Sequence, residues 1–283
     1  MPRVLIVLAM FAANCACAPA MRTGSRPPVP AHEFATTMRL QGSALQLHLS
    51  MPEQPAQPDG KRVLVLYASG DGGWFGSAVD MFHQIAKAGY YTVGFSSRAF
   101  LKINRSLGPL SSVNQLATDY REIIEQARAD LHLDDTVPAL LTGWSRGAAF
   151  AVLVASEPGE QQAIAGVVAI GLSEGEDLRI NGAEDETDDG SAGVEARTWP
   201  FEPYQQIARL KEPCAVIQSA HDNYLPAARA RSLFGPDSAS RRFYTIDAKN
   251  HRFSGGKEQF DIALLEAIDW IASPSTDGAP GQR

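Results

Sequence analysis

The sequence predicts an α/β fold in which a mostly parallel sheet carries helices on both faces. Continuous apolar runs alternate along the chain with segments of helical periodicity, which is typical of parallel strands joined by crossover helices. Glycine-containing turns follow the apolar runs that end at Tyr67 and Leu141. The 283 residues, 45% of them hydrophobic and 20% charged, suffice for one large domain with a sizeable core.

The N-terminal residues have the composition of a secretory signal peptide, assigned to 1–20. Arg3 precedes an apolar run from 4 to 13 that is too short to span a bilayer comfortably, and Ala18-Pro19-Ala20 offers a cleavage site. We therefore expect a periplasmic protein. An uncleaved anchor stays open as an alternative. So does a lipoprotein attached through Cys15 or Cys17, although neither cysteine has a convincing lipobox.

The domain boundaries follow from composition. Residues 21–35 are polar and contain proline, and we interpret them as a tether to a domain that covers 36–273. An acidic insertion at about 172–203 interrupts that domain, and its ends are predicted to form a cap over the site. Residues 274–283 are rich in proline, glycine and serine and form a predicted flexible tail.

The elements can be placed by periodicity. Alternation of leucines with polar residues predicts strand structure in 36–50, with a turn at Gly42-Ser43. Apolar runs without alternation predict strands covered on both faces, at residues 62–67, 91–95, 139–141, 164–170, 214–218 and 242–246. Apolar residues at helical spacing predict helices at residues 77–88, 112–131, 204–210, 225–234 and 259–271, and directly after Ser145.

The stretch Gly143-Trp144-Ser145-Arg146-Gly147 is the centre of this arrangement. A G-x-S-x-G pattern between a strand and a helix is the nucleophile elbow of a serine hydrolase. The turn is so sharp that Cβ atoms at 143 and 147 would collide with neighbouring backbone, so glycine is required at both positions. The helix after Ser145 directs its positive end at the site, which favours a developing oxyanion.

Asp222 and His251 complete a predicted catalytic triad with Ser145. Each of the three residues follows a predicted strand, so all three lie at the carboxyl edge of one sheet. Their chain order is the order found in the α/β-hydrolase fold. His251 would accept the hydroxyl proton, and Asp222 would orient the imidazole. His221 remains an alternative base and Glu174 an alternative acid.

The loop Ser69-Gly70-Asp71-Gly72-Gly73-Trp74 is predicted to bring its backbone close to a ligand. It lacks the lysine and Ser/Thr of a Walker phosphate loop. In an α/β-hydrolase this loop supplies one oxyanion-hole N–H, and the residue after the nucleophile supplies the other. We therefore assign the oxyanion hole to Arg146, Gly70 and Asp71, with an Asx turn as the alternative role of Asp71.

Substrate-binding candidates surround these groups. They are Asp71, Trp74, Trp144 and Glu174, with Glu176 as a further acid at the root of the insertion. The net charge of −7 argues against direct nucleic-acid binding. No cofactor is predicted, and no metal site either, because the six histidines include no i, i+4 pair and no Cys-x-x-Cys occurs. Cys214, in an apolar run, is predicted to be a buried core residue.

The Ser69–Trp74 loop, the elbow and Asn250-His251-Arg252-Phe253 together resemble the bacterial virulence protein family of VirJ and AcvB, over roughly residues 60–272. The resemblance implies an α/β-hydrolase fold, a periplasmic location, hydrolysis of aminoacylated phosphatidylglycerol and a link to secretion of transferred DNA complexes. It carries over Ser145, Asp222 and His251 as a triad. The acidic residues 183–193 and the segment after Ser97 depart from the family pattern.

We accordingly expect a serine esterase that forms an acyl-enzyme on Ser145. The leading substrate is the aminoacyl ester of a lipid headgroup, which implies peripheral contact with a membrane. A generic carboxylesterase or lipase-like hydrolase is the second hypothesis. The third is a non-catalytic periplasmic protein associated with secretion, and the presence of all three triad residues argues against it.

Overall fold

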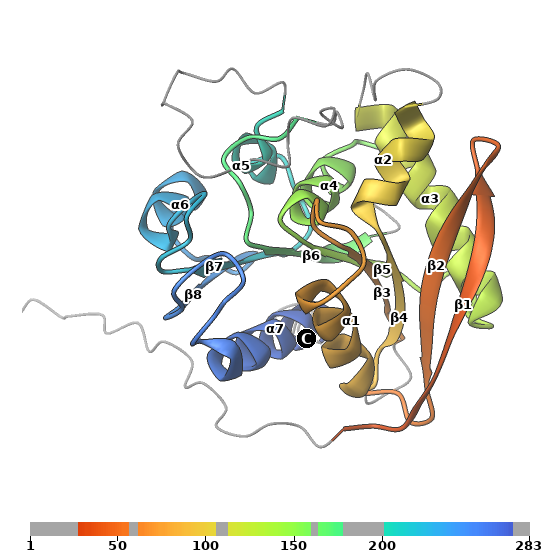
Figure 1. The fold of residues 1–283 in the computed structure, drawn as a ribbon. Coiled ribbons are helices and arrows are strands. Elements are labelled where there is room, and N and C mark those ends of the chain that lie inside the picture. The colour runs from red at the N-terminus through yellow and green to blue at the C-terminus, as the bar shows by residue number, and fades with distance from the viewer. Residues whose placement is uncertain (1–27, 57–61, 106–112, 160–163, 178–200, 274–283) are drawn as a thin grey trace, which may run out of the picture.

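A computed structural model describes residues 28–56, 62–105, 113–159, 164–177 and 201–273, and from residue 64 onward one or two helices follow each strand (Figure 1). The strands are β1 (Ala31–Leu40), β2 (Ser43–Pro52), β3 (Leu64–Ala68), β4 (Tyr91–Phe95), β5 (Ala139–Trp144), β6 (Ile164–Ile170), β7 (Cys214–Ser219) and β8 (Arg241–Ile246). The helices are α1 (Ser77–Lys87), α2 (Ser97–Arg105), α3 (Val113–Asp130), α4 (Arg146–Ala155), α5 (Pro203–Ile207), α6 (Ala227–Phe234) and α7 (Lys257–Ala272).

The strands form one eight-stranded sheet in the order β1-β2-β4-β3-β5-β6-β7-β8. β1 pairs antiparallel with β2, and β2 pairs antiparallel with β4. The pairings from β4 to β8 are all parallel. The predicted α/β class with a mostly parallel sheet is therefore confirmed, and the loops after β3, β5, β6, β7 and β8 meet at one edge.

Helices cover both faces of the sheet, α1 and α7 on one face and α2 to α6 on the other (Figure 1). All residues of β3 and β4 are buried, as expected for strands with helices on both sides. Four aromatic side chains pack together between the sheet and helices α2, α3 and α4: Phe95, Phe100, Tyr120 and Phe150. This packing fixes α4, and with it the turn that bears Ser145.

Two sequence-based boundaries need correction. β1 begins at Ala31, so the last five residues of the predicted tether (21–35) belong to the sheet. The turn predicted at Gly42-Ser43 lies one residue earlier, because β1 and β2 form a hairpin around Gln41 and Gly42. The missed helix α2 buries Phe100, Leu101 and Ile103, so tertiary packing outweighs its weak local signal.

Several sequence-based predictions fall outside the described residues. They are the signal peptide 1–20 with Cys15 and Cys17, the acidic residues 183–193 within the insertion, and the tail 274–283. Of the insertion at 172–203, the described ends meet in an antiparallel bridge between Glu176 and Phe201. None of the helices in the described ranges combines the length and apolar character needed to cross a membrane.

Candidate active site

Ser145 occupies a strained turn between β5 and α4. Its φ of 56° and ψ of −117° lie in a region that non-glycine residues rarely adopt. Two hydrogen bonds hold this conformation. The Ser145 N–H donates to the Ile170 carbonyl at 2.8 Å, and the Ser145 carbonyl accepts from the Ala148 N–H at 2.9 Å. The hydroxyl is thereby presented at the carboxyl edge of the sheet.

The glycines on either side of Ser145 are required by close backbone contacts. A Cβ at Gly143 would lie 2.3 Å from the Gly147 carbonyl carbon, and a Cβ at Gly147 would lie 2.1 Å from the Ala68 carbonyl oxygen. A change of side-chain rotamer could not relieve these contacts, because the opposing atoms belong to the backbone. The structure thus shows the collisions that the sequence pattern predicts.

His251 and Asp222 are hydrogen-bonded to each other. The Nδ1 atom of His251 lies 2.7 Å from Asp222 Oδ2, and the two residues are only 8% and 1% exposed. The carboxylate also accepts from Gln218 Nε2 at 3.1 Å and from the Tyr224 N–H at 2.9 Å. Both oxygens of Asp222 are therefore held in place, and the pairing favours the imidazole tautomer with its proton on Nδ1.

The imidazole ring of His251 is enclosed by three residues. Trp144 stacks on it with centroids 5.5 Å apart, and Trp144 Nε1–H donates to the His251 carbonyl at 3.3 Å. Tyr224 lies edge-on at 4.9 Å. Gly171, with φ of 58°, leaves room below, because a Cβ there would approach His251 Cε1 to 2.8 Å.

His251 Nε2 is buried and has no hydrogen-bond partner among the described residues. In unliganded hydrolases the bond between base and nucleophile commonly tightens only when substrate binds. Sequence reasoning missed the contributions of Gly171, Gln218 and Tyr224 to this arrangement. Their only sequence signal is that each lies at or beyond the end of a predicted strand.

The loop after β3 lies against Ser145. A Cβ at Gly70 would be 3.5 Å from Ser145 Cβ, and the Gly70 carbonyl accepts from the Gly73 N–H at 3.1 Å and from Ser97 Oγ at 2.7 Å. Arg146 is the first residue of α4, so its N–H has no partner within the helix. The structure thus brings two of the predicted oxyanion-hole residues, Gly70 and Arg146, to the nucleophile. Asp71 is exposed in the same turn.

A buried ion pair adjoins the elbow. Arg146 Nε donates to Glu176 Oε1 at 3.0 Å, and Glu176 is only 7% exposed. Burial raises the pKa of Glu176 to about 7; Arg146 opposes this shift, and the charges of Asp71 and Asp177 add to it. Asp71, Arg146 and Glu176 therefore interact electrostatically beside Ser145, an association that sequence reasoning did not specify.

Neither the alternative acid, Glu174, nor the alternative base, His221, belongs to the hydrogen-bonded pair of His251 and Asp222. Glu174 forms an exposed ion pair with Arg229 at 2.7 Å, while the carboxylate bonded to His251 belongs to Asp222. His221 is exposed, although it precedes the buried Asp222 in sequence. The contacts of Glu174 give no support to its predicted role in substrate binding. The acid that forms an ion pair with Arg146, beside the elbow, is Glu176.

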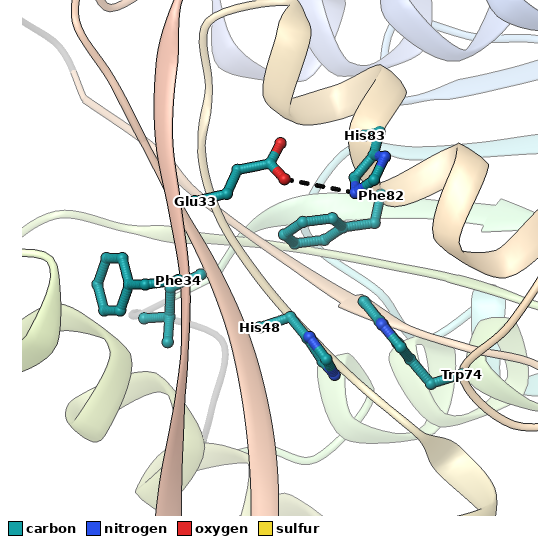
Figure 2. Close-up of a pocket in the computed structure, with 7 residues that line it drawn as sticks. Glu33, Phe34, His48, Trp74, Phe82 and His83 are labelled. Atoms are coloured by element: carbon teal, nitrogen blue, oxygen red, sulfur yellow. Dashed lines mark ion pairs between the residues drawn. The ribbon is translucent and has the colours of Figure 1, made fainter.

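Trp74 and Trp144 both make ring contacts within the protein. Trp74 stacks on His48 at 4.3 Å and meets the edge of Phe82, in a pocket of about 180 Å³ beside the Glu33–His83 ion pair (Figure 2). These contacts anchor the loop after β3 from the side facing β2 and α1. Trp144 packs on His251 and so positions the candidate base.

Other reactive groups in the structure are few. Within the described ranges, no group of three or more His, Cys, Asp or Glu side chains is placed to hold a metal ion. Cys214 lies buried in β7, as predicted, and burial raises the pKa of its thiol to about 12. The thiol is therefore protonated at neutral pH and is a poor nucleophile.

Comparison with known proteins identifies the fold. No protein-family model and no curated protein sequence matches the chain. The esterase domain of a Rhodothermus marinus protein is 18% identical over 84% of this chain and 98% of its own, with a TM-score of 0.55. Dienelactone hydrolase from Anabaena variabilis is 17% identical over 84% of this chain and 96% of its own, with a TM-score of 0.54.

Est1E from Butyrivibrio proteoclasticus is 16% identical over 84% of this chain and 99% of its own, with a TM-score of 0.57. The chain has the α/β-hydrolase fold. At these identities the similarity defines the architecture, and the chemistry must be argued from the residues of the site.

Proposed function

We propose that this protein is a serine hydrolase that cleaves carboxylic esters through an acyl-enzyme on Ser145. The observation that carries the proposal is the buried 2.7 Å contact between His251 Nδ1 and Asp222 Oδ2, next to a serine held in a strained elbow. Backbone strain of this kind persists where the surrounding structure enforces it, and it concentrates at functional sites.

The geometry suggests the order of events. His251 Nε2 takes the Ser145 hydroxyl proton as the oxygen attacks the ester carbonyl, while Asp222 stabilises the imidazolium. The Arg146 N–H, together with an N–H from the loop of Gly70 and Asp71, stabilises the oxyanion. His251 then protonates the departing alcohol. Water activated by the same imidazole finally releases the acid from Ser145.

Labelling with a fluorophosphonate probe tests the proposal directly. We expect the wild-type protein to be labelled at Ser145 and the Ser145→Ala variant to remain unlabelled. Ser145→Ala and His251→Ala should each lower ester turnover by about 10⁴-fold without unfolding the protein. Asp222→Asn should also be severely impaired, because it no longer selects the imidazole tautomer. Wild-type activity in Ser145→Ala would rule out the mechanism, and an inert wild-type protein would favour a non-catalytic role.

The finer proposal is that the substrate is an aminoacyl ester of a lipid headgroup. The resemblance to the VirJ and AcvB family supports it, and so do the acids near Ser145, because an aminoacyl group carries an ammonium beside the scissile carbonyl. Asp71 is exposed on the loop that contacts Ser145, and its negative charge contributes to the upward shift of the Glu176 pKa. A carboxylate at this position can attract an ammonium while Arg146 neutralises Glu176.

A comparison of two esters separates this substrate from an uncharged one. Asp71→Asn should lower kcat/KM for an alanyl ester by about two- to fivefold and leave kcat/KM for the matching acetyl ester nearly unchanged. Glu174→Gln is the matched control, because Glu174 is paired with Arg229. Equal losses on both esters in Asp71→Asn would mean that Asp71 only shapes the loop.

We also propose that the protein is exported to the periplasm, where it would meet lipid substrates at a membrane surface. The support is the pattern of residues 1–20. N-terminal sequencing of the mature protein should begin near Met21. Intact Met1 in the cytoplasmic fraction would contradict export, whereas an acyl group on Cys15 or Cys17 would identify a lipoprotein.

A further inference from the structure

Two exposed aromatic side chains lie in loops at the sheet edge that carries Ser145. In the part of the chain that the structure describes, Phe75 and Tyr224 are the large hydrophobic residues left exposed, at 65% and 59%. Phe75 lies in the loop after β3, and Tyr224 lies in the loop after β7. Because β5 runs between β3 and β7 in the sheet, the two loops lie on opposite sides of β5, at the same sheet edge.

Tyr224 is tied to the His251 side of the site. Its backbone N–H donates to Asp222 Oδ1 at 2.9 Å, and its ring meets the His251 imidazole edge-on, with centroids 4.9 Å apart and planes at 75°. The hydrogen bond from the backbone N–H fixes the position of the Tyr224 backbone, and the contact with the imidazole restricts the orientation of the Tyr224 ring. Even so, more than half of the residue stays open to solvent.

The chemistry of ester cleavage places the departing alcohol on this side. His251 must give its proton to the alcohol oxygen, so the alcohol leaves from a position next to the imidazole. The acyl group stays on Ser145, whose Cβ borders Gly70 of the loop after β3. The open surface of Tyr224 therefore borders the path of the alcohol.

We propose that Tyr224 forms one wall of the leaving-group subsite and that the preferred substrates are esters of alcohols with an apolar body, such as an aromatic ring or an alkyl chain. The inference rests on the proposed esterase function of Ser145. Covering the exposed ring with an apolar alcohol removes hydrocarbon surface from water on both partners, whereas methanol is too small to do so. Tyr224 is thus a specificity-determining residue.

The test compares benzyl acetate with methyl acetate, which share an acyl group, as dispersed monomers. The quantity measured is the ratio of kcat/KM for the two esters, so differences in intrinsic reactivity cancel between variants. Tyr224→Ser should reduce this ratio on the order of tenfold. Tyr224→Phe keeps the ring and should keep the ratio. Phe75→Ser removes a similarly exposed ring from the loop after β3 and should also keep it.

Equal losses on both esters in Tyr224→Ser would overturn the inference, because they would show that the ring only orients His251. A comparable fall of the ratio in Phe75→Ser would overturn it as well, by showing that any exposed aromatic residue at the edge suffices. Both outcomes leave the esterase proposal intact. A wild-type protein that hydrolyses neither ester and resists fluorophosphonate labelling would overturn the proposed function and the inference together.

Discussion

At the level of single residues, two buried carboxylates lie in or beside the candidate active site, and their surroundings differ. Asp222 is almost fully buried, yet both of its oxygens accept hydrogen bonds, so its charge is compensated. Glu176 is buried with one strong partner, Arg146, and with other acids nearby. The raised pKa of Glu176 therefore links its burial to the pH dependence of stability.

The pH dependence of stability should change in Glu176→Gln. Burial raises the pKa of Glu176 from 4.5 to about 7 in the folded protein. Between these values the folded protein holds a proton that the unfolded chain releases, so this contribution to stability is complete below pH 4.5 and disappears as pH rises through about 7. The difference in unfolding free energy between wild type and Glu176→Gln should fall on the order of 3 kcal/mol between about pH 4 and pH 8.

Urea unfolding at several pH values measures this difference, and other carboxylates cancel because both proteins share them. A difference that stays constant over the whole range would show that the pKa of Glu176 is the same in the folded protein as in the unfolded chain, so that Arg146 offsets the cost of burial.

Substitution of Gly171 should impair turnover without a matching loss of stability. In Gly171→Ala the new Cβ would lie 2.8 Å from His251 Cε1, so the imidazole must shift from its position. Because small displacements of a base are costly, kcat should fall about 10- to 100-fold. Gly42→Ala is the matched control: it shares a positive φ, 82° against 58°, but nothing lies within 4 Å of the new Cβ. Similar kinetics in the two variants would refute a role of Gly171 in placing His251.

The unit of β5, the turn at Ser145 and α4 is the element on which the site depends. β5 pairs in parallel with β3 and β6, and all residues of α4 from Gly147 to Ala155 are buried. The strain at Ser145 is therefore opposed by packing on every side, and the turn cannot relax without disturbing the centre of the sheet.

Alanine at Gly147 should destabilise the whole domain. Its Cβ would lie 2.1 Å from the Ala68 carbonyl oxygen, which is backbone of the central strand β3 and cannot move aside cheaply. We expect a loss of unfolding free energy on the order of 3 kcal/mol or more. Gly159→Ala, where nothing lies within 4 Å, should have almost no effect. A Gly147→Ala protein with wild-type stability in urea would contradict the packing of the elbow.

The sequence predicts those elements whose structure depends on local pattern. The elbow could be predicted because its glycines and serine are adjacent, and Asp222 and His251 because each follows an apolar strand. The packing of Trp74 could not be predicted, since its stacking partner His48 lies on β2, far away in sequence. The start of β1 was missed because its first residues are largely exposed and carry little hydrophobic periodicity.

At the level of the whole molecule, the antiparallel hairpin protects one edge of the sheet. β1 pairs with β2 along all ten of its residues, and β2 in turn pairs with β4. Leu45, Leu47 and Leu49 of β2 are buried. Without β1, an apolar strand with unpaired backbone groups would be left at the edge, which is a hazard for aggregation.

Truncation of the chain tests this role of β1 and the corrected domain boundary together. A chain that begins at residue 28 keeps β1, one that begins at residue 36 loses its first half, and one that begins at residue 42 loses it entirely. Loss of the buried Met38 and Leu40 removes about 4 kcal/mol of hydrophobic stabilisation. The shortest chain should therefore melt about 10 °C lower than the longest, and it should associate with increasing concentration.

Within β1, Leu40→Asn and Arg39→Asn form a matched pair, because Leu40 is buried and its neighbour Arg39 points to solvent. Only the first should lower Tm. If the chain that begins at residue 42 remained monomeric and melted at the same temperature as the chain that begins at residue 28, β1 would be dispensable and the domain would begin at β2.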